Sequence, residues 1–165
     1  MSCKNYKVGP NEICPSRGVV YNKNINGLSG KDKNLDSLLE PQIDITITKG
    51  VMVYCVQETW VVGNSVVMVR GHMIFLHNRV KRVEGIIGRN PGGVAIILAP
   101  SAVVAWKEPG LSPPTTTPLT SKFVGRFVGI KMSFPKFDKW GKRVRDFLKI
   151  FVASIYHTDD IKESG

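Results

Sequence analysis

The sequence has few cysteines, few acidic residues and no long apolar segment. Its three cysteines, Cys3, Cys14 and Cys55, are odd in number and widely spaced, which excludes a disulfide framework and a cysteine-based zinc site. The longest apolar stretch, 94–106, is interrupted by Pro100 and is shorter than the roughly 18 residues of a membrane-spanning helix. The N-terminus lacks the apolar run of a secretory signal. We therefore predict an intracellular protein, in the nucleus or cytoplasm, that does not bind a membrane.

Acidic residues are scarce relative to basic ones, with 13 Asp and Glu against 23 Lys and Arg and a net charge of +10. The segment 121–150 holds nine basic residues and two acidic ones, with aromatic residues among them. Such a mixture is typical of phosphate contacts combined with base stacking. The alternative is a loop whose aromatic residues anchor it to the core while its lysines face water. The candidate nucleic-acid-binding residues are Lys122, Arg126, Lys136, Lys139, Lys142, Arg143 and Arg145.

The apolar runs predict a single α/β domain over residues 19–160, preceded by an irregular segment 1–18 and followed by a tail 161–165. Continuous apolar runs without alternation indicate strands that are covered on both faces, as in layered α/β folds. A short helix is predicted around 101–107 and a loop over 111–120. The predicted strands are 19–25, 51–56, 66–69, 73–77, 92–98, 123–132 and 148–156, the last of them central in its sheet.

A longer helix is predicted near the start of the domain. Asp32 is a plausible N-cap, the leucines of 35–39 share one helical face, and Pro41 is expected to end the pattern. The segment 43–48 alternates isoleucine with polar residues. This alternation is compatible with a half-buried strand or with a frayed connection after the helix.

Polar residues follow two of the apolar strands directly. Asn24 and Asn26 come at the end of the first strand, and Glu58 follows the buried run 51–56. Ligands of open α/β sheets bind at strand ends of this kind, and a carboxylate oxygen is a ligand that Mg²⁺ prefers. The alternatives are a solvent-facing carboxylate at Glu58 and a simple turn at Asn26-Gly27.

The order of these motifs resembles the endonuclease/exonuclease/phosphatase family, which includes exonuclease III-like repair nucleases and the endonuclease domains of non-LTR retrotransposons. The retrotransposon branch is the most similar in the blocks 88–90, 92–98, 125–127 and 153–157. The resemblance covers most of the chain but only about the first half of the family's domain. The resemblance rests on Asn24-Ile25-Asn26-Gly27-Leu28, Gln57-Glu58-Thr59, the strand 92–97 and Tyr156.

The resemblance implies a Mg²⁺-dependent (or Mn²⁺-dependent) phosphodiesterase that acts on DNA. It places Glu58 as the metal ligand, Asn24 as the active-site asparagine with Asn26 beside it, and Tyr156 as a contact to the substrate phosphate. The implied fold is part of a four-layer α/β sandwich, with two mixed β-sheets face to face and helices outside.

The sequence also departs from the family pattern. The family's second half carries an Asp-x-Asn and an Asp-His pair; here the single Asp-x-Asn, 32–34, lies at a helix start and no histidine follows an aspartate. Lys23 replaces an aromatic residue, and His157-Thr158 stands where proline is common. We therefore expect that this chain is the N-terminal half of the domain and is weakly active or inactive alone. We also expect that it self-associates or needs a second chain to cover the exposed sheet face. The alternatives are a non-catalytic, basic nucleic-acid-binding remnant and a gene fragment without selected function.

Overall fold

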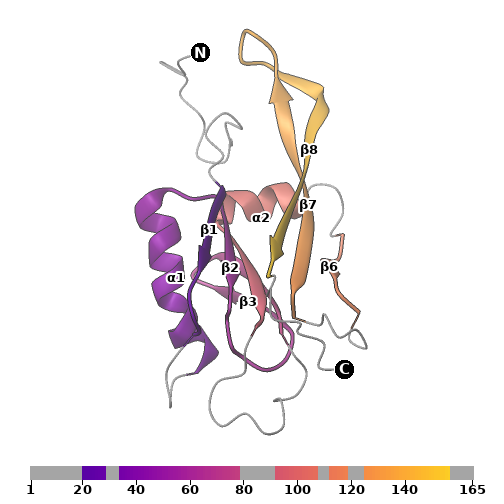
Figure 1. Ribbon diagram of the computed structural model, residues 1–165. Helices are drawn as coiled ribbons and strands as arrows, with labels where there is room; N and C mark the ends of the chain where they lie inside the picture. The colour runs from indigo at the N-terminus through magenta and orange to yellow at the C-terminus, as the bar shows by residue number, and fades with distance from the viewer. Residues whose placement is uncertain (1–19, 29–33, 79–91, 108–111, 119–124, 157–165) are drawn as a thin grey trace, which may run out of the picture.

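The computed structural model describes residues 20–28, 34–78, 92–107, 112–118 and 125–156. These residues form a mixed α/β structure, mostly of strands, with two sheets and two helices (Figure 1). The predicted terminal segments 1–18 and 161–165 lie outside the described residues, as do Asp32 and Lys122. Within the described ranges, no helix is long and apolar enough to cross a membrane.

The five-stranded sheet has the order β1-β2-β5-β4-β3. β1 pairs with β2 in parallel, and the other pairs are antiparallel. β2 and β5 are buried along their whole length, which confirms the prediction that these apolar runs are covered on both faces. The strands are β1 (Val20–Asn24), β2 (Val53–Gln57), β3 (Ser65–Val69), β4 (His72–His77) and β5 (Val94–Leu98).

The hairpin of β3 and β4 turns at Arg70-Gly71. Both residues have positive φ angles, 49° for Arg70 and 77° for Gly71. A two-residue hairpin turn with two positive φ angles matches the right-handed twist of the flanking strands. The Arg70 guanidinium also donates to the Asp44 carboxylate at 2.7 Å, which ties this turn to the first helix.

The first helix, α1 (Leu35–Lys49), is longer than predicted. Its N-cap is Asn34, whose Oδ1 accepts the N–H of Ser37 at 2.9 Å, so the assignment of the cap to Asp32 is wrong. Pro41 lies inside the helix and does not end it. The helix ends at Gly50, which adopts the left-handed conformation at φ 61°.

The segment 43–48 is helical, and both interpretations of its alternation are wrong. Leu39, Ile43 and Thr46 are the buried residues of α1, at the three- and four-residue spacing of a helix face. Ile47, which the strand pattern places beside Ile43, is 54% exposed. Packing on the sheet therefore selects the helical period over the period of two.

The second sheet has the order β6-β7-β8 and is dominated by a long hairpin. Its strands are β6 (Thr115–Thr116), β7 (Phe127–Phe137) and β8 (Arg143–Ile155). β8 lies at the edge of this sheet in the described part of the chain, so its prediction as a central strand is wrong. The far end of the hairpin extends well beyond the two packed sheets (Figure 1). We call this end, residues 135–148, the arm.

Two apolar clusters hold the layers together. One fills the space between the two sheets and includes Phe75, Ile96, Ile130 and Trp106, the last from helix α2 (Pro100–Lys107). The other lies between α1 and the opposite face of the five-stranded sheet. The layers are thus helix, sheet and sheet. No described element covers the outer face of the three-stranded sheet.

Candidate functional site

The two predicted polar segments meet at one end of the five-stranded sheet. The parallel register pairs Asn24 with Gln57, so Glu58 follows directly beside the end of β1. Beyond the sheet the segments stay together, because Ile25 N–H donates to Gln57 C=O at 3.1 Å and Leu28 N–H donates to Thr59 C=O at 2.9 Å. The pairing of β1 with β2 therefore brings Asn24 and Glu58 to the same edge.

Tyr156 reaches the same end of the molecule from the other sheet. It follows β8, and its N–H donates to the Arg126 carbonyl at 2.8 Å. Its ring lies against Gly92, where an added Cβ would stand 3.8 Å from a ring carbon. The Gly92 carbonyl in turn accepts the N–H of Trp60 at 3.0 Å. Tyr156 is therefore one residue layer away from the segment that contains Glu58.

The backbone at this edge adopts conformations that most side chains avoid. Four described non-glycine residues have positive φ angles, and three of them are here: Asn26 at 51°, Glu58 at 56° and Trp60 at 57°. Asparagine tolerates the left-handed region, but glutamate and tryptophan pay about 1 to 2 kcal/mol each. Strained backbone of this kind is concentrated at functional sites.

Packing of the Trp60 ring accounts for part of this geometry. The ring lies on Gly27, where a Cβ would approach a ring carbon to 2.3 Å. Gly27 itself has a φ of 102°, which glycine alone adopts without strain. The Asn26-Gly27 turn predicted from the sequence is present. Its Asn24 Oδ1 accepts the N–H of Asn26 at 3.0 Å, so the turn and the candidate site use the same residues.

A buried polar network includes Gln57, the residue before Glu58, and joins the two sheets. Gln57 Nε2 donates to Ser154 Oγ at 3.0 Å and to Asn22 Oδ1, and Ser154 Oγ donates to the Val56 carbonyl at 3.0 Å. Ser154 and Gln57 are both buried. Sequence reasoning did not assign a role to either residue. Their signal is a polar residue next to, or inside, an apolar strand.

A second network holds the chain that follows Glu58. Thr59 Oγ1 donates to Asn78 Oδ1, and Asn78 Nδ2 donates to the Gly63 carbonyl at 2.8 Å. Asn78 N–H donates to Asn64 Oδ1 at 2.7 Å. Thr59 and Asn78 are fully buried. Glu58 therefore stands on a segment with fixed neighbours on both sides, Gln57 and Thr59.

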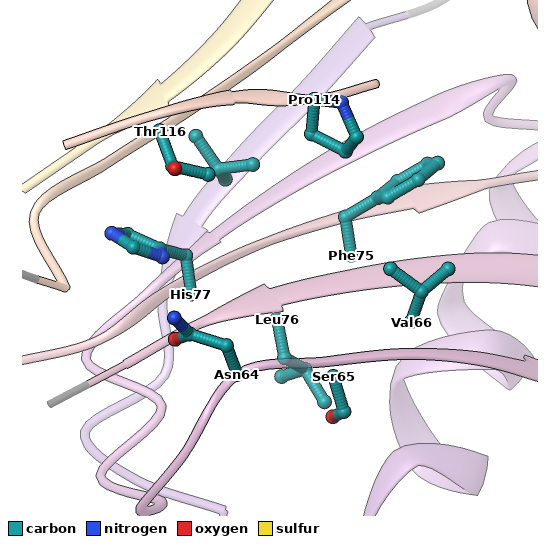
Figure 2. A pocket seen from close by; sticks show the side chains of 9 residues that line it. Asn64, Ser65, Val66, Phe75, Leu76, His77, Pro114 and Thr116 are labelled. Carbon is teal, nitrogen blue, oxygen red and sulfur yellow. The ribbon is translucent and has the colours of Figure 1, made fainter. Parts of the chain in front are cut away.

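A cavity of about 340 Å³ opens farther along the same edge, between the two sheets (Figure 2). His77 and Asn64 stand at its polar end, while Phe75, Val66 and Pro114 form the apolar part. His77 Nε2 lies 3.1 Å from Thr117 Oγ1. Burial lowers the pKa of His77 below its ordinary value, although a hydrogen bond with the Thr117 backbone opposes the shift. Because no acidic residue lines the cavity, it is separate from the predicted metal ligand.

Glu58 is half-buried and is the one carboxylate among the site residues predicted from the sequence. The described residues contain no group of three or more His, Cys, Asp or Glu placed to hold a metal ion. Mg²⁺ commonly takes one or two protein carboxylates and completes its shell with water and substrate phosphate. The donor set at this edge fits that mode of binding.

The candidate nucleic-acid-binding residues separate into two places. Arg126 is half-buried beside Tyr156, at the candidate site. The other described members lie in the arm, in a regular hairpin, so the interpretation of this segment as a loop is wrong. β8 spans 13 residues, which corresponds to about 40 Å of extended chain. The arm members are Lys136, Lys139, Lys142, Arg143 and Arg145.

Comparison with known proteins gives no relative for this chain: no family model matches, and neither the curated proteins nor the solved structures contain a match. Function is therefore inferred from the geometry of the site and the order of its motifs.

Proposed function

We propose that the edge formed by β1, β2 and the end of β8 is the N-terminal half of a metal-dependent phosphodiesterase site, of the kind found in DNA endonucleases. The observation that carries the proposal is the convergence of Asn24, Glu58 and Tyr156. These residues come from three strands and two sheets, yet lie at one end of the molecule. Sequence distance between them is large, so their meeting depends on the fold.

Each residue has a role that its position supports. The half-buried Glu58 carboxylate would hold Mg²⁺ or Mn²⁺ together with a substrate phosphate. The metal would polarise the phosphorus centre for attack by water. Asn24 directs its Oδ1 to the N–H of Asn26, which fixes the amide and leaves Nδ2 to donate to a phosphate oxygen. Tyr156 Oη would donate to the same phosphate from the opposite sheet.

The left-handed conformation of Glu58 also supports the proposal. A glutamate that only faces solvent at a strand end gains nothing from a strained backbone. Here the φ of 56° is maintained by neighbours on both sides, Gln57 in the intersheet network and Thr59 in the Asn78 network. The backbone that carries the carboxylate is therefore fixed before a metal binds, as the support of a first metal ligand requires.

The outer face of the three-stranded sheet is the place where the missing part of a four-layer sandwich would pack. This face carries exposed Phe151 and Ile155, at 51% and 61% exposure. The same missing part would supply the general base that the described residues near Glu58 lack. We therefore expect low activity from this chain alone, in keeping with the retrotransposon-derived remnant that the motif order suggests.

The test measures Mn²⁺ binding in the presence of a short DNA duplex by electron paramagnetic resonance. A second assay measures nicking of supercoiled plasmid with Mg²⁺ or EDTA. Glu58→Gln is the test variant, and Glu40→Gln, an exposed carboxylate on α1, is the matched control. The proposal expects Mn²⁺ binding that is lost in Glu58→Gln and kept in Glu40→Gln. Equal Mn²⁺ binding by both variants would refute a metal site at Glu58, and any nicking must follow the same pattern.

A further inference from the structure

We propose that the arm is a docking element for double-stranded DNA, separate from the candidate phosphodiesterase site. This inference rests on the proposed function for the reaction that the bound DNA would undergo. It adds the partner, duplex DNA, and the surface of the protein that binds it. The binding itself requires no metal. Its basis is the distribution of charge over the two faces of the hairpin.

One face of the hairpin is basic and carries no carboxylate in its described residues. Side chains alternate between faces along a strand, so Arg143, Arg145 and Lys149 share the outer face of β8 with Phe147. The 5.5 Å contact of the Arg143 guanidinium with the Phe147 ring agrees with this assignment. Lys149 and Lys131 lie outside the arm but on the same face, where the basic row meets the apolar patch at Phe151, the register partner of Lys131.

The two acidic residues of the hairpin are both engaged elsewhere. Asp146 alternates to the opposite face, where it forms an ion pair with Lys136. Asp138 closes the turn at the tip, where its Oδ1 accepts the N–H groups of Trp140 and Lys142, both at 2.9 Å. Neither carboxylate lies on the outer face with Arg145, Lys149 and Lys131, although the charge of Asp146 interacts with Lys149 as well as with its ion-pair partner Lys136. Exposed cations gathered on one face in this way displace counterions from phosphates.

Trp140 stands at the tip of the arm and is 75% exposed. The Lys139 ammonium lies 4.3 Å from the centre of its ring. A tryptophan ring exposed to this degree beside a cation, at the end of a projecting hairpin, gains no stability from core packing. Its exposed ring is available for contact with a partner that the arm binds.

The shape of the arm favours duplex DNA over other polyanions. The major groove of B-DNA admits a two-stranded β-ribbon, whereas the major groove of A-form RNA is too narrow for side chains to read. The arm is such a ribbon, and it projects free of the packed sheets (Figure 1). Its tip lies at the opposite end of β8 from Tyr156. A duplex that contacts the tip of the arm is therefore held there about 40 Å from the candidate site.

The experiment measures affinity for a 20-base-pair duplex in EDTA over a range of salt concentrations. Lys142→Gln/Arg145→Gln, two exposed residues of the arm, is the test pair. Lys49→Gln/Lys107→Gln, on α1 and α2, removes the same charge from other surfaces. We expect the salt slope to fall by about 2 in the test pair, about 1 for each lost phosphate contact, and to stay unchanged in the control pair. Equal losses in both pairs, or a wild-type affinity without salt dependence, would overturn the inference.

A second measurement uses Trp140 and does not depend on the folding of a charge variant. DNA should change the tryptophan fluorescence of the wild type, and Trp140→Phe should abolish most of the change, because Trp106 is buried and Trp60 lies on Gly27. A change that survives in Trp140→Phe contradicts the role of the tip. Tighter binding of single-stranded DNA, RNA or anionic lipid vesicles than of duplex would assign the arm to another partner. Since Glu58→Gln retains the arm, its loss of Mn²⁺ binding and its duplex affinity in EDTA test the two proposals separately.

Discussion

Gly93 occupies a position at which no other side chain fits. A Cβ there would lie 2.2 Å from Asn78 Oδ1 and 2.3 Å from Thr59 Oγ1, and the φ angle is 91°. The Thr59–Asn78 hydrogen bond is buried, and it holds the segment that follows Glu58. The conformation of Glu58 therefore depends on a glycine more than thirty residues later in the chain.

Replacement of Gly93 by alanine is expected to destabilise the protein by about 3 kcal/mol. About 1 to 2 kcal/mol comes from the left-handed backbone and the rest from disruption of a buried hydrogen bond. Gly63→Ala is the control, because Gly63 has nearly the same φ, 89°, but no atom within 4 Å of the added Cβ. Urea unfolding measures both variants. Equal losses would mean that the contact with Thr59 and Asn78 contributes nothing.

The pH dependence of stability is expected to include a contribution from His77. Burial lowers its pKa in the folded protein below the ordinary value of 6.5. In the interval between the lowered value and 6.5 the unfolded chain binds more protons than the folded one, so the free energy of unfolding decreases as the pH falls. Unfolding curves recorded from pH 7 to pH 5 should show this decrease in the wild type. His77→Gln should flatten it, and an unchanged slope would show that His77 titrates normally.

The residues of the candidate site differ in how far the sequence reveals them. Asn24 and Glu58 are visible because polar residues follow apolar runs directly, and strand pairing places them together. The Gln57–Ser154 contact is not visible, because 97 residues separate the partners and no local pattern links them. Cys55 lies in the core, and its burial raises the pKa of the thiol to about 11.

At the scale of elements, local signals predict the buried strands and fail for α1. Continuous apolar runs place β2 and β5 within two residues of their observed bounds, since covering on both faces requires such runs. Alternation over 43–48 misleads because Thr46 is buried. Its Oγ1 is satisfied by the Ile43 carbonyl at 2.7 Å and lies 2.8 Å from His72 Nε2. A polar residue that finds partners inside the core disguises the helical period.

Pro41 is an element-level irregularity with a measurable effect. It removes the N–H that would bond to the Ser37 carbonyl inside α1, and proline is about 3 kcal/mol less favourable than alanine in a helix interior. Part of that cost is offset by the smaller entropy of the unfolded chain, about 0.4 to 1 kcal/mol. Pro41→Ala should therefore stabilise the protein by about 2 kcal/mol in urea unfolding. Glu40→Ala, the exposed neighbour, should change stability by less than about 0.5 kcal/mol. A loss of stability in Pro41→Ala would contradict the argument.

At the scale of the whole molecule, the outer face of the three-stranded sheet is an apolar surface that no described element covers. Phe127 and Phe151 stack on it at a centroid distance of 6.5 Å, and the Phe151 ring lies over Gly129. Ile155 extends the apolar area to the end of β8. Exposed apolar patches of this type favour association with another surface.

Self-association through this face is expected and should respond to one substitution. Phe151→Lys places a charge in the middle of the patch and should shift sedimentation toward the monomer. Val104→Lys is the control, because Val104 is also half-exposed, at 53%, but lies on α2. Analytical ultracentrifugation over a range of protein concentrations measures the shift. A monomeric wild type, or the same shift in both variants, would show that this face does not mediate association.

The lengths of the loops that are closed by strand pairing also have a consequence for the order of folding events. β3 and β4 are joined by a two-residue turn, so their pairing closes a very short loop. β2 joins β5 across about forty residues, and the intersheet bond from Gln57 to Ser154 closes a loop of 97. Long loops lose more entropy before their contacts form, and chains rich in such contacts fold slowly. We expect the β3–β4 hairpin to form early and the site containing Glu58 to be assembled last, in the rate-limiting step.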